Sequence, residues 1–216
     1  MDYPKIYSPW KKAKAGEKRF TSEWTYAEME YLSGLNWDGY EKIDGLHIRV
    51  TMDLSGFSFE GRTAKVQIPS PLLIHLANLF VSRFNVLYEY FRESLEDGKK
   101  VYFYGEGYGG RLPGGSKYRA DPAFALFDIR IGEYWLPQDL ISAVAGNTEL
   151  PRAAFRWRGT LLEAAESLLN HGHKFYSKHA KEPDCPIAGL VLRPMVELSR
   201  LDGGRIITKL MVKDLR

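Results

Sequence analysis

The chain has 216 residues, of which 44% are hydrophobic and 26% are charged, and its formal net charge at pH 7 is only +3. This length predicts a single domain over residues 1–216 with a sizeable core. The low net charge excludes a polybasic nucleic-acid coat, so binding of nucleic acid would need local clusters of Lys and Arg. No apolar run has transmembrane length and no signal-peptide pattern opens the chain, so we expect a cytoplasmic protein without a membrane partner.

The hydrophobic pattern predicts the first elements in chain order. Residues 1–36 are polar, and we expect them to be irregular. The basic stretch 11–19 is interpreted as a solvated surface segment. Strict alternation predicts a half-buried strand over 47–52, followed by a turn at Gly56 and a returning strand over 57–62. Ser70-Pro71 marks a helix start, and an apolar stripe carries this helix to about Phe80.

Strands and helices are also predicted in the rest of the chain. Strands are expected over 101–104, 124–131, 190–192 and 206–210, and helices after Leu136-Pro137 and over 160–169. Strands dominate the two ends and helices the middle. This order favours an α+β protein with mainly antiparallel sheets.

Three tempting motifs do not carry a function. Residues 105–110 match G-x-G-x-x-G, but a dinucleotide fingerprint must open a helix, and a Gly- and Pro-containing loop follows here. Residues 114–117 lack the order of a phosphate-binding loop. His171 and His173 flank a glycine without a nearby third ligand, which is typical of an exposed loop. We therefore assign no metal ligand.

Five segments in a meaningful order point to the chemistry. They are Tyr40-Glu41-Lys42-Ile43-Asp44-Gly45, Tyr104–Tyr108, Phe124–Asp128, Gly189–Pro194 and Ile207–Leu210. A lone K-x-D-G is a weak signal, but all five in this order resemble the motif series of covalent nucleotidyltransferases, the superfamily of polynucleotide ligases and capping enzymes. Three further features narrow the resemblance to one family of this superfamily: Glu41 directly before the lysine, the segment Gly61-Arg62-Thr63, and Gly204–Ile207 at the start of the last motif. The chain resembles the phage-type ATP-dependent RNA ligases.

The resemblance implies a fold and an activity. The fold is an α+β adenylation domain in which mainly antiparallel sheets surround a nucleotide cleft, with helices outside. The activity is that of an ATP-dependent RNA ligase, which joins RNA 3′-hydroxyl to 5′-phosphate ends through a lysyl-adenylate. ATP, with Mg or Mn, is the implied cofactor, and its AMP is carried covalently on Lys42. A lysine amine attacks phosphorus only in its neutral form.

The resemblance also assigns residues to the nucleoside. Glu41 matches the residue that reads the adenine amino group, and Glu106 matches the acid that holds a ribose hydroxyl. Phe127 matches the aromatic residue that stacks on adenine, although an ordinary core Phe on a hydrophobic strand is the alternative. Gly45 permits a turn whose backbone approaches the nucleotide. His47 stands where the family prefers Asn and is expected at the same site.

Three further residues are assigned to the reacting groups. Arg62 matches the arginine that contacts the ribose or the RNA end. Asp128 is expected to position catalytic groups. Lys209 matches the lysine that contacts the α-phosphate, where it would stabilise the charge of in-line transfer.

The sequence departs from the family pattern at two positions that bear on catalysis. Ala188 stands where relatives have a Glu that helps to hold a divalent metal, and Met211 stands where they have a second lysine, for which Lys213 is a possible substitute. The chain stops soon after the last motif, so no C-terminal accessory domain is expected. A weakened ligase, a minimal DNA ligase and a non-catalytic nucleotide- or RNA-end-binding module all stay open.

Overall fold

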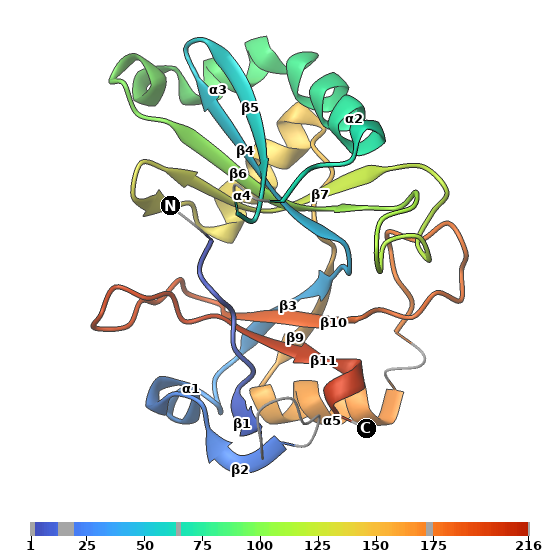
Figure 1. The fold of residues 1–216 in the computed structure, drawn as a ribbon. Coiled ribbons are helices and arrows are strands. Elements are labelled where there is room, and N and C mark those ends of the chain that lie inside the picture. The colour runs from blue at the N-terminus through green and yellow to red at the C-terminus, as the bar shows by residue number, and fades with distance from the viewer. Residues whose placement is uncertain (1–2, 13–19, 64–65, 172–174, 216) are drawn as a thin grey trace. The chain divides into compact units, whose positions relative to one another are not determined.

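The computed structural model describes residues 3–12, 20–63, 66–171 and 175–215. The chain forms two compact units, each with its own sheet and its own core (Figure 1). The first unit comprises Met1–Tyr3 and Asp44–Ala153, and the second comprises Pro4–Ile43 and Ala154–Arg216. The grouping of residues 1–216 into one domain stays a prediction.

The first unit contains a five-stranded antiparallel sheet in the order β5-β4-β6-β7-β8. Alternation along β4 places Ile48, Val50 and Met52 on one face, all fully buried. Their neighbours Val101 and Phe103 on β6 share that face because paired residues point the same way. The strands are β4 (Leu46–Asp53), β5 (Gly56–Gly61), β6 (Val101–Tyr108), β7 (Ala123–Ile131) and β8 (Tyr134–Trp135).

Three helices cover this apolar face and complete the core of the first unit (Figure 1). They are α2 (Ser70–Val81), α3 (Phe84–Glu96) and α4 (Gln138–Thr148). The predicted helix start at Ser70-Pro71 is confirmed. The sequence interpretation missed α3, although Leu87, Phe91 and Leu95 repeat every four residues and are buried.

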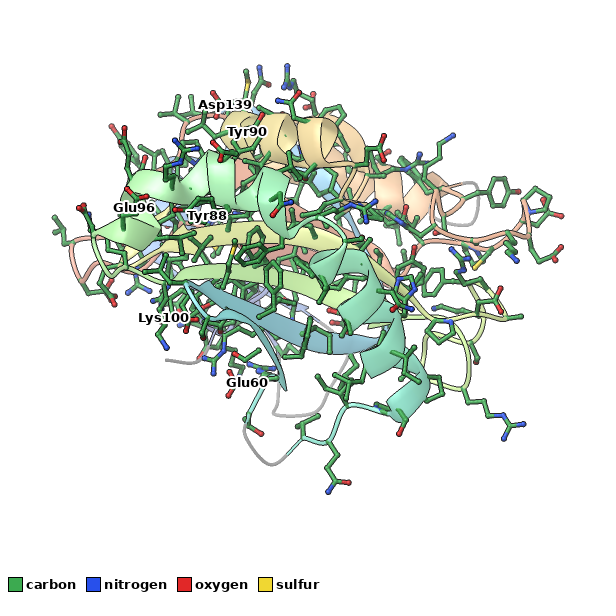
Figure 2. All side chains as sticks on the ribbon, turned by 90° about the horizontal axis from the view of Figure 1, so that it is seen from above. Glu60, Tyr88, Tyr90, Glu96, Lys100 and Asp139 are labelled. Carbon is green, nitrogen blue, oxygen red and sulfur yellow. The ribbon has the colours of Figure 1, made fainter. Side chains whose placement is uncertain are left out.

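A side-chain hydrogen bond runs along α3 outside its buried stripe. The Tyr88 hydroxyl donates a hydrogen bond to Glu96 Oε1 at 2.9 Å, and both residues are labelled in Figure 2. The helix therefore has the amphipathic character that its apolar spacing predicts, with a buried stripe and a hydrogen-bonded polar surface.

The second unit contains a four-stranded antiparallel sheet in the order β11-β10-β3-β9. One face carries Trp37, Leu190, Leu192 and Leu210, which pack with α5 (Leu161–His171) into a second core. The strands are β3 (Trp37–Lys42), β9 (Phe155–Gly159), β10 (Gly189–Pro194) and β11 (Thr208–Met211).

Helix α5 begins with a capping box. The Thr160 N–H donates to Glu163 Oε2 at 2.8 Å, and the Glu163 N–H donates to Thr160 Oγ1 at 3.3 Å. These hydrogen bonds from Thr160 lower the pKa of the Glu163 carboxyl below its ordinary value. The reciprocal bonds fix where the helix starts, close to the predicted boundary at residue 160.

The N-terminal segment corrects one expectation. Residues 1–36 are not irregular throughout, because they contain β1 (Trp10–Lys12), β2 (Phe20–Trp24) and α1 (Ala27–Tyr31). The rings of Trp10 and Trp24 lie 5.2 Å apart across this small hairpin, so tertiary packing outweighs the polar composition. Residues 13–19 of the predicted basic stretch lie outside the described residues. A short 3₁₀ helix, η1 (Val212–Asp214), follows β11.

The predicted fold class is confirmed. Helices and antiparallel sheets occur together in both units, which is an α+β arrangement. The predicted concentration of helices in the middle is only partly right, because β6 and β7 lie between α3 and α4 in the chain.

Candidate functional site

The face of the first sheet that the helices leave uncovered collects several predicted site residues. Cross-strand partners share a face, and the register pairs His47 with Glu106 and Tyr104 with Asp128. Because Tyr104 lies two residues from Glu106 on β6, all four side chains project from one side. The predicted residues His47, Glu106 and Asp128 are therefore neighbours on one face of the sheet.

A β-bulge adds Phe127 to this group. The ladder passes from Tyr104↔Asp128 to Gly105↔Leu126, so Phe127 is the extra residue of β7 without a partner in the ladder. A bulge re-aims a side chain, and the Phe127 ring lies 5.5 Å from the His47 ring. Without the bulge, the alternation would place Phe127 and Asp128 on opposite faces. The sequence pattern of an ordinary hydrophobic strand gave no sign of this irregularity.

Tyr3 is a residue of this site that the sequence interpretation missed. Its hydroxyl donates a hydrogen bond to Asp128 Oδ2 at 2.5 Å. Its ring lies 5.1 Å from His47 and 5.3 Å from Phe127. Burial raises the pKa of neighbouring Tyr104 above its ordinary value. Tyr3 and Asp128 are 125 positions apart, so no local pattern could have linked them.

Gly45 and Arg62 have different surroundings. A Cβ on Gly45 would lie 2.2 Å from the Gly107 carbonyl oxygen, so only glycine fits this close approach of two backbones. The preceding Asp44 N–H donates to the Tyr118 hydroxyl at 3.1 Å. Arg62 lies on an exposed bend directly after β5, beyond the paired part of the strand.

In the second unit, the register places both predicted lysines on one face of the sheet. Tyr40 pairs with Val191, which pairs with Lys209, and Lys42 lies two residues after Tyr40 on β3. Residues two apart on a strand share a face. Lys42 and Lys209 therefore project from the same side, opposite the core. The Lys42 ammonium donates a hydrogen bond to its neighbouring carbonyl, Ile43 O, at 2.8 Å.

The two departures from the family pattern lie beside Lys42 in the same sheet. Gly189 pairs with Lys42 on one side and with Met211 on the other, so these three residues form one row. A Cβ on Gly189 would lie 2.1 Å from Leu210 O, which explains the glycine. Ala188 directly precedes this row and accepts a hydrogen bond from the Val212 N–H at 3.0 Å.

Glu41 lies on the opposite face from Lys42. It pairs with the core residue Leu190, and its side chain is only 2% exposed. Its carboxylate accepts hydrogen bonds from the Ser177 hydroxyl and from the Lys178 N–H, the latter at 2.9 Å. The predicted contact of Glu41 with adenine stays a prediction. Each carboxylate oxygen has a second acceptor site for such a contact.

A closed ring of hydrogen bonds surrounds this carboxylate. The Glu41 N–H donates to Ala154 O at 2.8 Å, and the Ala154 N–H donates to His179 Nε2 at 3.2 Å. The His179 N–H donates to Ser177 Oγ at 3.0 Å, and Ser177 in turn binds Glu41. Burial lowers the pKa of His179, an effect that the charge of Glu41 opposes. The ring fixes the backbone directly before Lys42.

Among residues 3–12, 20–63, 66–171 and 175–215, no three His, Cys, Asp or Glu side chains gather as a metal-binding group. His173 is outside these ranges. Within the same part of the chain, every helix is too short or too polar to cross a membrane.

The fold is that of an RNA ligase domain. The structure is similar to three structures of the RNA ligase of Naegleria gruberi: one with PPi, a mutant with AMP and Mn, and a mutant with ATP and Mn. The TM-scores are 0.60, 0.61 and 0.60, at 18%, 17% and 15% identity. The matches cover 97%, 96% and 97% of this chain but only 61%, 61% and 57% of those chains, so the chain spans about three-fifths of their length.

The sequence gives the family. The RNA ligase family model matches residues 37–211, and the chain belongs to this family. This stretch begins at β3 and ends at the last residue of β11, so it includes both Lys42 and Lys209. A search of curated protein sequences found no match.

Proposed function

We propose that this protein is an ATP-dependent RNA ligase of the phage type, within the covalent nucleotidyltransferase superfamily, that acts in the cytoplasm. The observation that carries the proposal is the placement of Lys42 and Lys209 on one face of a sheet, opposite its core, in a chain of the RNA ligase family. Two ammonium groups on one face suit a polyanionic substrate, because charge-assisted hydrogen bonds to phosphate are strong.

Lys42 is the proposed nucleophile. Its neutral amine attacks the α-phosphorus of ATP; a nitrogen–phosphorus bond forms, the bond to pyrophosphate breaks, and the amine releases a proton to solvent. An oxygen of the RNA 5′-phosphate then attacks the same phosphorus, which frees the amine and leaves AMP on the RNA. Finally, a 3′-hydroxyl attacks the RNA phosphate, and AMP departs as the strands join.

Other residues are proposed to stabilise these steps. Lys209 would contact the α-phosphate, where a fixed cation offsets the charge that develops during transfer. Arg62 would contact the ribose or the RNA end. A divalent ion, Mg or Mn, would neutralise phosphate charge; such ions commonly bind through substrate phosphates and one or two carboxylates. We assign no protein ligand for it.

The nucleoside is proposed to be held by residues whose placement in the first unit suits that role. Phe127 offers an aromatic ring beside His47, and Glu106 stands across from His47 on the next strand. An aromatic ring can stack on a base, and a nearby carboxylate can accept a hydrogen bond from a ribose hydroxyl, so the pair suits a nucleoside. Asp128 would position catalytic groups, and the backbone at Gly45 would approach the nucleotide. Glu41, in the second unit, would accept a hydrogen bond from the adenine amino group. Guanine presents a carbonyl at that edge, so this contact would favour ATP over GTP.

A non-catalytic module that binds nucleotides or RNA ends is the second candidate. Two observations favour it: Met211 occupies the row of Lys42, and Ala188 directly precedes that row. Neither side chain carries the positive charge that would pair with a phosphate or the carboxylate that would hold Mg or Mn. Ala188 and Met211 are equally compatible with a ligase of reduced activity. An experiment therefore has to distinguish a weak ligase from a binding module.

The deciding experiment is incubation with ATP labelled on the α-phosphate, Mg and then nicked or single-stranded RNA. A ligase should show one AMP on the protein by intact-protein mass spectrometry, and Lys42→Ala should remove it. Lys99→Ala, at an exposed lysine of the first unit, is the matched control. Labelling of Lys42→Ala would disprove the assignment of the nucleophile, and a complete lack of labelling in the unmodified chain would favour the binding module.

A further inference from the structure

Two glycine-rich segments, residues 105–110 and 114–117, match neither nucleotide-binding fingerprint, but the structure brings them together after β6. The Gly109 N–H donates a hydrogen bond to Gly115 O at 3.1 Å. The chain between these two glycines therefore folds back on itself through consecutive turns. We call residues 109–119 the glycine loop. It is a part of the first unit to which neither the motif series nor the proposed reaction assigns a role.

The glycine loop holds Asp44, which lies two residues after the proposed nucleophile. The Asp44 N–H donates a hydrogen bond to the Tyr118 hydroxyl at 3.1 Å, and Lys117 Nζ lies 4.0 Å from Asp44 Oδ2. Tyr118 is fully buried, and its ring packs edge-on against the Tyr108 ring at 5.7 Å. The ion pair with Lys117 is half-exposed, so it contributes little. The buried hydroxyl of Tyr118 is therefore the contact that fixes the backbone at Asp44.

Gly114 leaves the space that the Asp44 carboxylate occupies. Its φ is +72°, and a Cβ there would lie 2.7 Å from Asp44 Cγ and Oδ2. A side chain at position 114 would therefore displace the carboxylate, in addition to the strain of a positive φ. Gly98 has almost the same φ, +73°, but nothing lies within 4 Å of the place of its Cβ. The two glycines thus separate backbone strain from the loss of the contact with Asp44.

One peptide group connects the glycine loop to Lys42. The N–H of the peptide group between Ile43 and Asp44 donates to the Tyr118 hydroxyl, and its carbonyl oxygen accepts the hydrogen bond from the Lys42 ammonium at 2.8 Å. The N–H and the C=O of a peptide group lie in one plane and turn together. A rotation that breaks the bond to Tyr118 would therefore also carry Ile43 O away from the Lys42 ammonium.

We propose that Tyr118 is a positioning residue for Lys42, which it orients through the peptide group between Ile43 and Asp44. The glycine loop keeps the Tyr118 hydroxyl in place. The inference rests on the proposed function, because the direction of the Lys42 amine affects the rate only if this amine attacks the α-phosphorus. A misplacement of about 1 Å can reduce a rate by about 10²-fold. The loss should therefore appear in the rate of transfer rather than in the affinity for ATP.

The positioning role is tested by removal of the hydroxyl alone. Tyr118→Phe should lower the single-turnover rate of AMP transfer to Lys42 at saturating ATP by roughly 10- to 100-fold. The ATP concentration that gives half of the maximal rate should stay unchanged. Tyr134→Phe, at an exposed tyrosine of the same unit, is the matched control and should retain the full rate. Lys117→Ala, which removes only the half-exposed ion pair, should lower the rate less than Tyr118→Phe.

The two glycines provide a second test of the loop. Gly114→Ala and Gly98→Ala each place a Cβ on a backbone with a φ close to +72°. Both should lower the free energy of unfolding measured by urea titration, because both introduce the same strain. Only Gly114→Ala should also lower the rate of AMP transfer in the folded protein, since only its Cβ meets Asp44. Equal rates in the two variants would show that the loop does not act on the nucleophile.

A readout without ATP follows the Lys42 amine directly. Its rate of acetylation by acetic anhydride is measured by peptide mass spectrometry, with Lys99 of the same chain as the internal reference. Tyr118→Phe should raise this rate, because the amine is no longer held against Ile43 O. A small reagent can approach from any direction, whereas a bound α-phosphate requires one orientation of the amine. Slower AMP transfer together with faster acetylation is a combination that a general loss of structure would not produce, and Tyr134→Phe should change neither rate.

The outcomes separate this inference from the proposed ligase. Unchanged rates of AMP transfer and acetylation in folded Tyr118→Phe would overturn the positioning role, even if Lys42 takes up AMP. A weaker affinity for ATP with an unchanged maximal rate would also overturn it, because Tyr118 would then act in nucleotide binding. A chain that never takes up AMP, but whose Lys42 is acetylated faster in Tyr118→Phe, would overturn the ligase proposal and keep the link between Tyr118 and Lys42.

Discussion

Lys42 and Lys209 project from the same face of the four-stranded sheet, with β10 between their strands. Val191 pairs with Lys209 and Gly189 pairs with Lys42, so the two lysines are offset by one row along the strands. Neighbouring strands lie about 4.8 Å apart, so the two backbones are separated by about 10 Å, a distance that two extended lysine side chains can span.

Removal of the Lys209 ammonium should slow adenylation of Lys42 more than it weakens nucleotide binding. Loss of a single preorganised electrostatic group commonly reduces the rate by about 10²–10³-fold. We therefore expect Lys209→Ala to reduce the single-turnover rate of AMP transfer to Lys42 by this order, and Lys209→Arg to recover part of it. Lys213→Ala shows whether the exposed lysine of η1 contributes to the same step. An unchanged rate in Lys209→Ala would rule out its phosphate role.

Restoration of the family residues at Ala188 and Met211 should accelerate the reaction. A carboxylate at 188 would help to place a metal ion, and an amine at 211 would stand in the row of Lys42. We expect Ala188→Glu to raise the single-turnover rate by about 10-fold or more and Met211→Lys to give a smaller gain. Met195→Lys, at an exposed methionine, is the control for added charge. If even the double variant forms no adenylate, the binding module is the better interpretation.

The hydroxyl of Tyr3 should stabilise the first unit through Asp128. Tyr3→Phe removes a donor from a fully buried carboxylate, while the ring contacts remain. Hydrogen bonds to charged groups contribute about 1.5–3 kcal/mol, so the free energy of unfolding should fall by about this amount. Urea titration measures it, with Tyr31→Phe as the exposed control. Equal stability of the two variants would show that the Tyr3–Asp128 bond contributes nothing.

His179 should make the protein less stable in mild acid. Burial lowers its pKa in the folded state, so below the unfolded pKa of about 6.5 the unfolded chain binds more protons than the folded one. The free energy of unfolding should therefore decrease as pH falls below about 6.5 and level off below the folded pKa. Protonated His179 also cannot accept the hydrogen bond from the Ala154 N–H.

A variant without the titrating group checks this pH dependence. His179→Gln cannot take up a proton in this range, so urea titrations between neutral and mildly acidic pH should show a shallower decline. Burial lowers the pKa of His75 in the same direction. The double variant His75→Gln with His179→Gln should therefore be flatter still. A decline as steep as in the unmodified chain would show that neither histidine is responsible.

Much of the fold could be predicted because local patterns determine it. The strands around 47–52, 57–62 and 124–131 and the helix from Ser70 all formed close to the predicted bounds. Period-2 alternation and helix caps act over a few residues, so they can be read without the rest of the chain. The order of the five motif segments likewise indicated the RNA ligase family, which the family model confirms over residues 37–211.

Tertiary structure alone decided how the predicted site residues are grouped. The bulge that aims Phe127 depends on the pairing of β6 with β7, and the same-face position of Lys42 and Lys209 depends on β10 between them. Tyr3 reached Asp128, and Ser177 reached Glu41, across 125 and 136 positions. A sequence specifies residue types and local periods, but a contact between distant segments exists only once strand order and register are fixed, because register determines which side chains share a face.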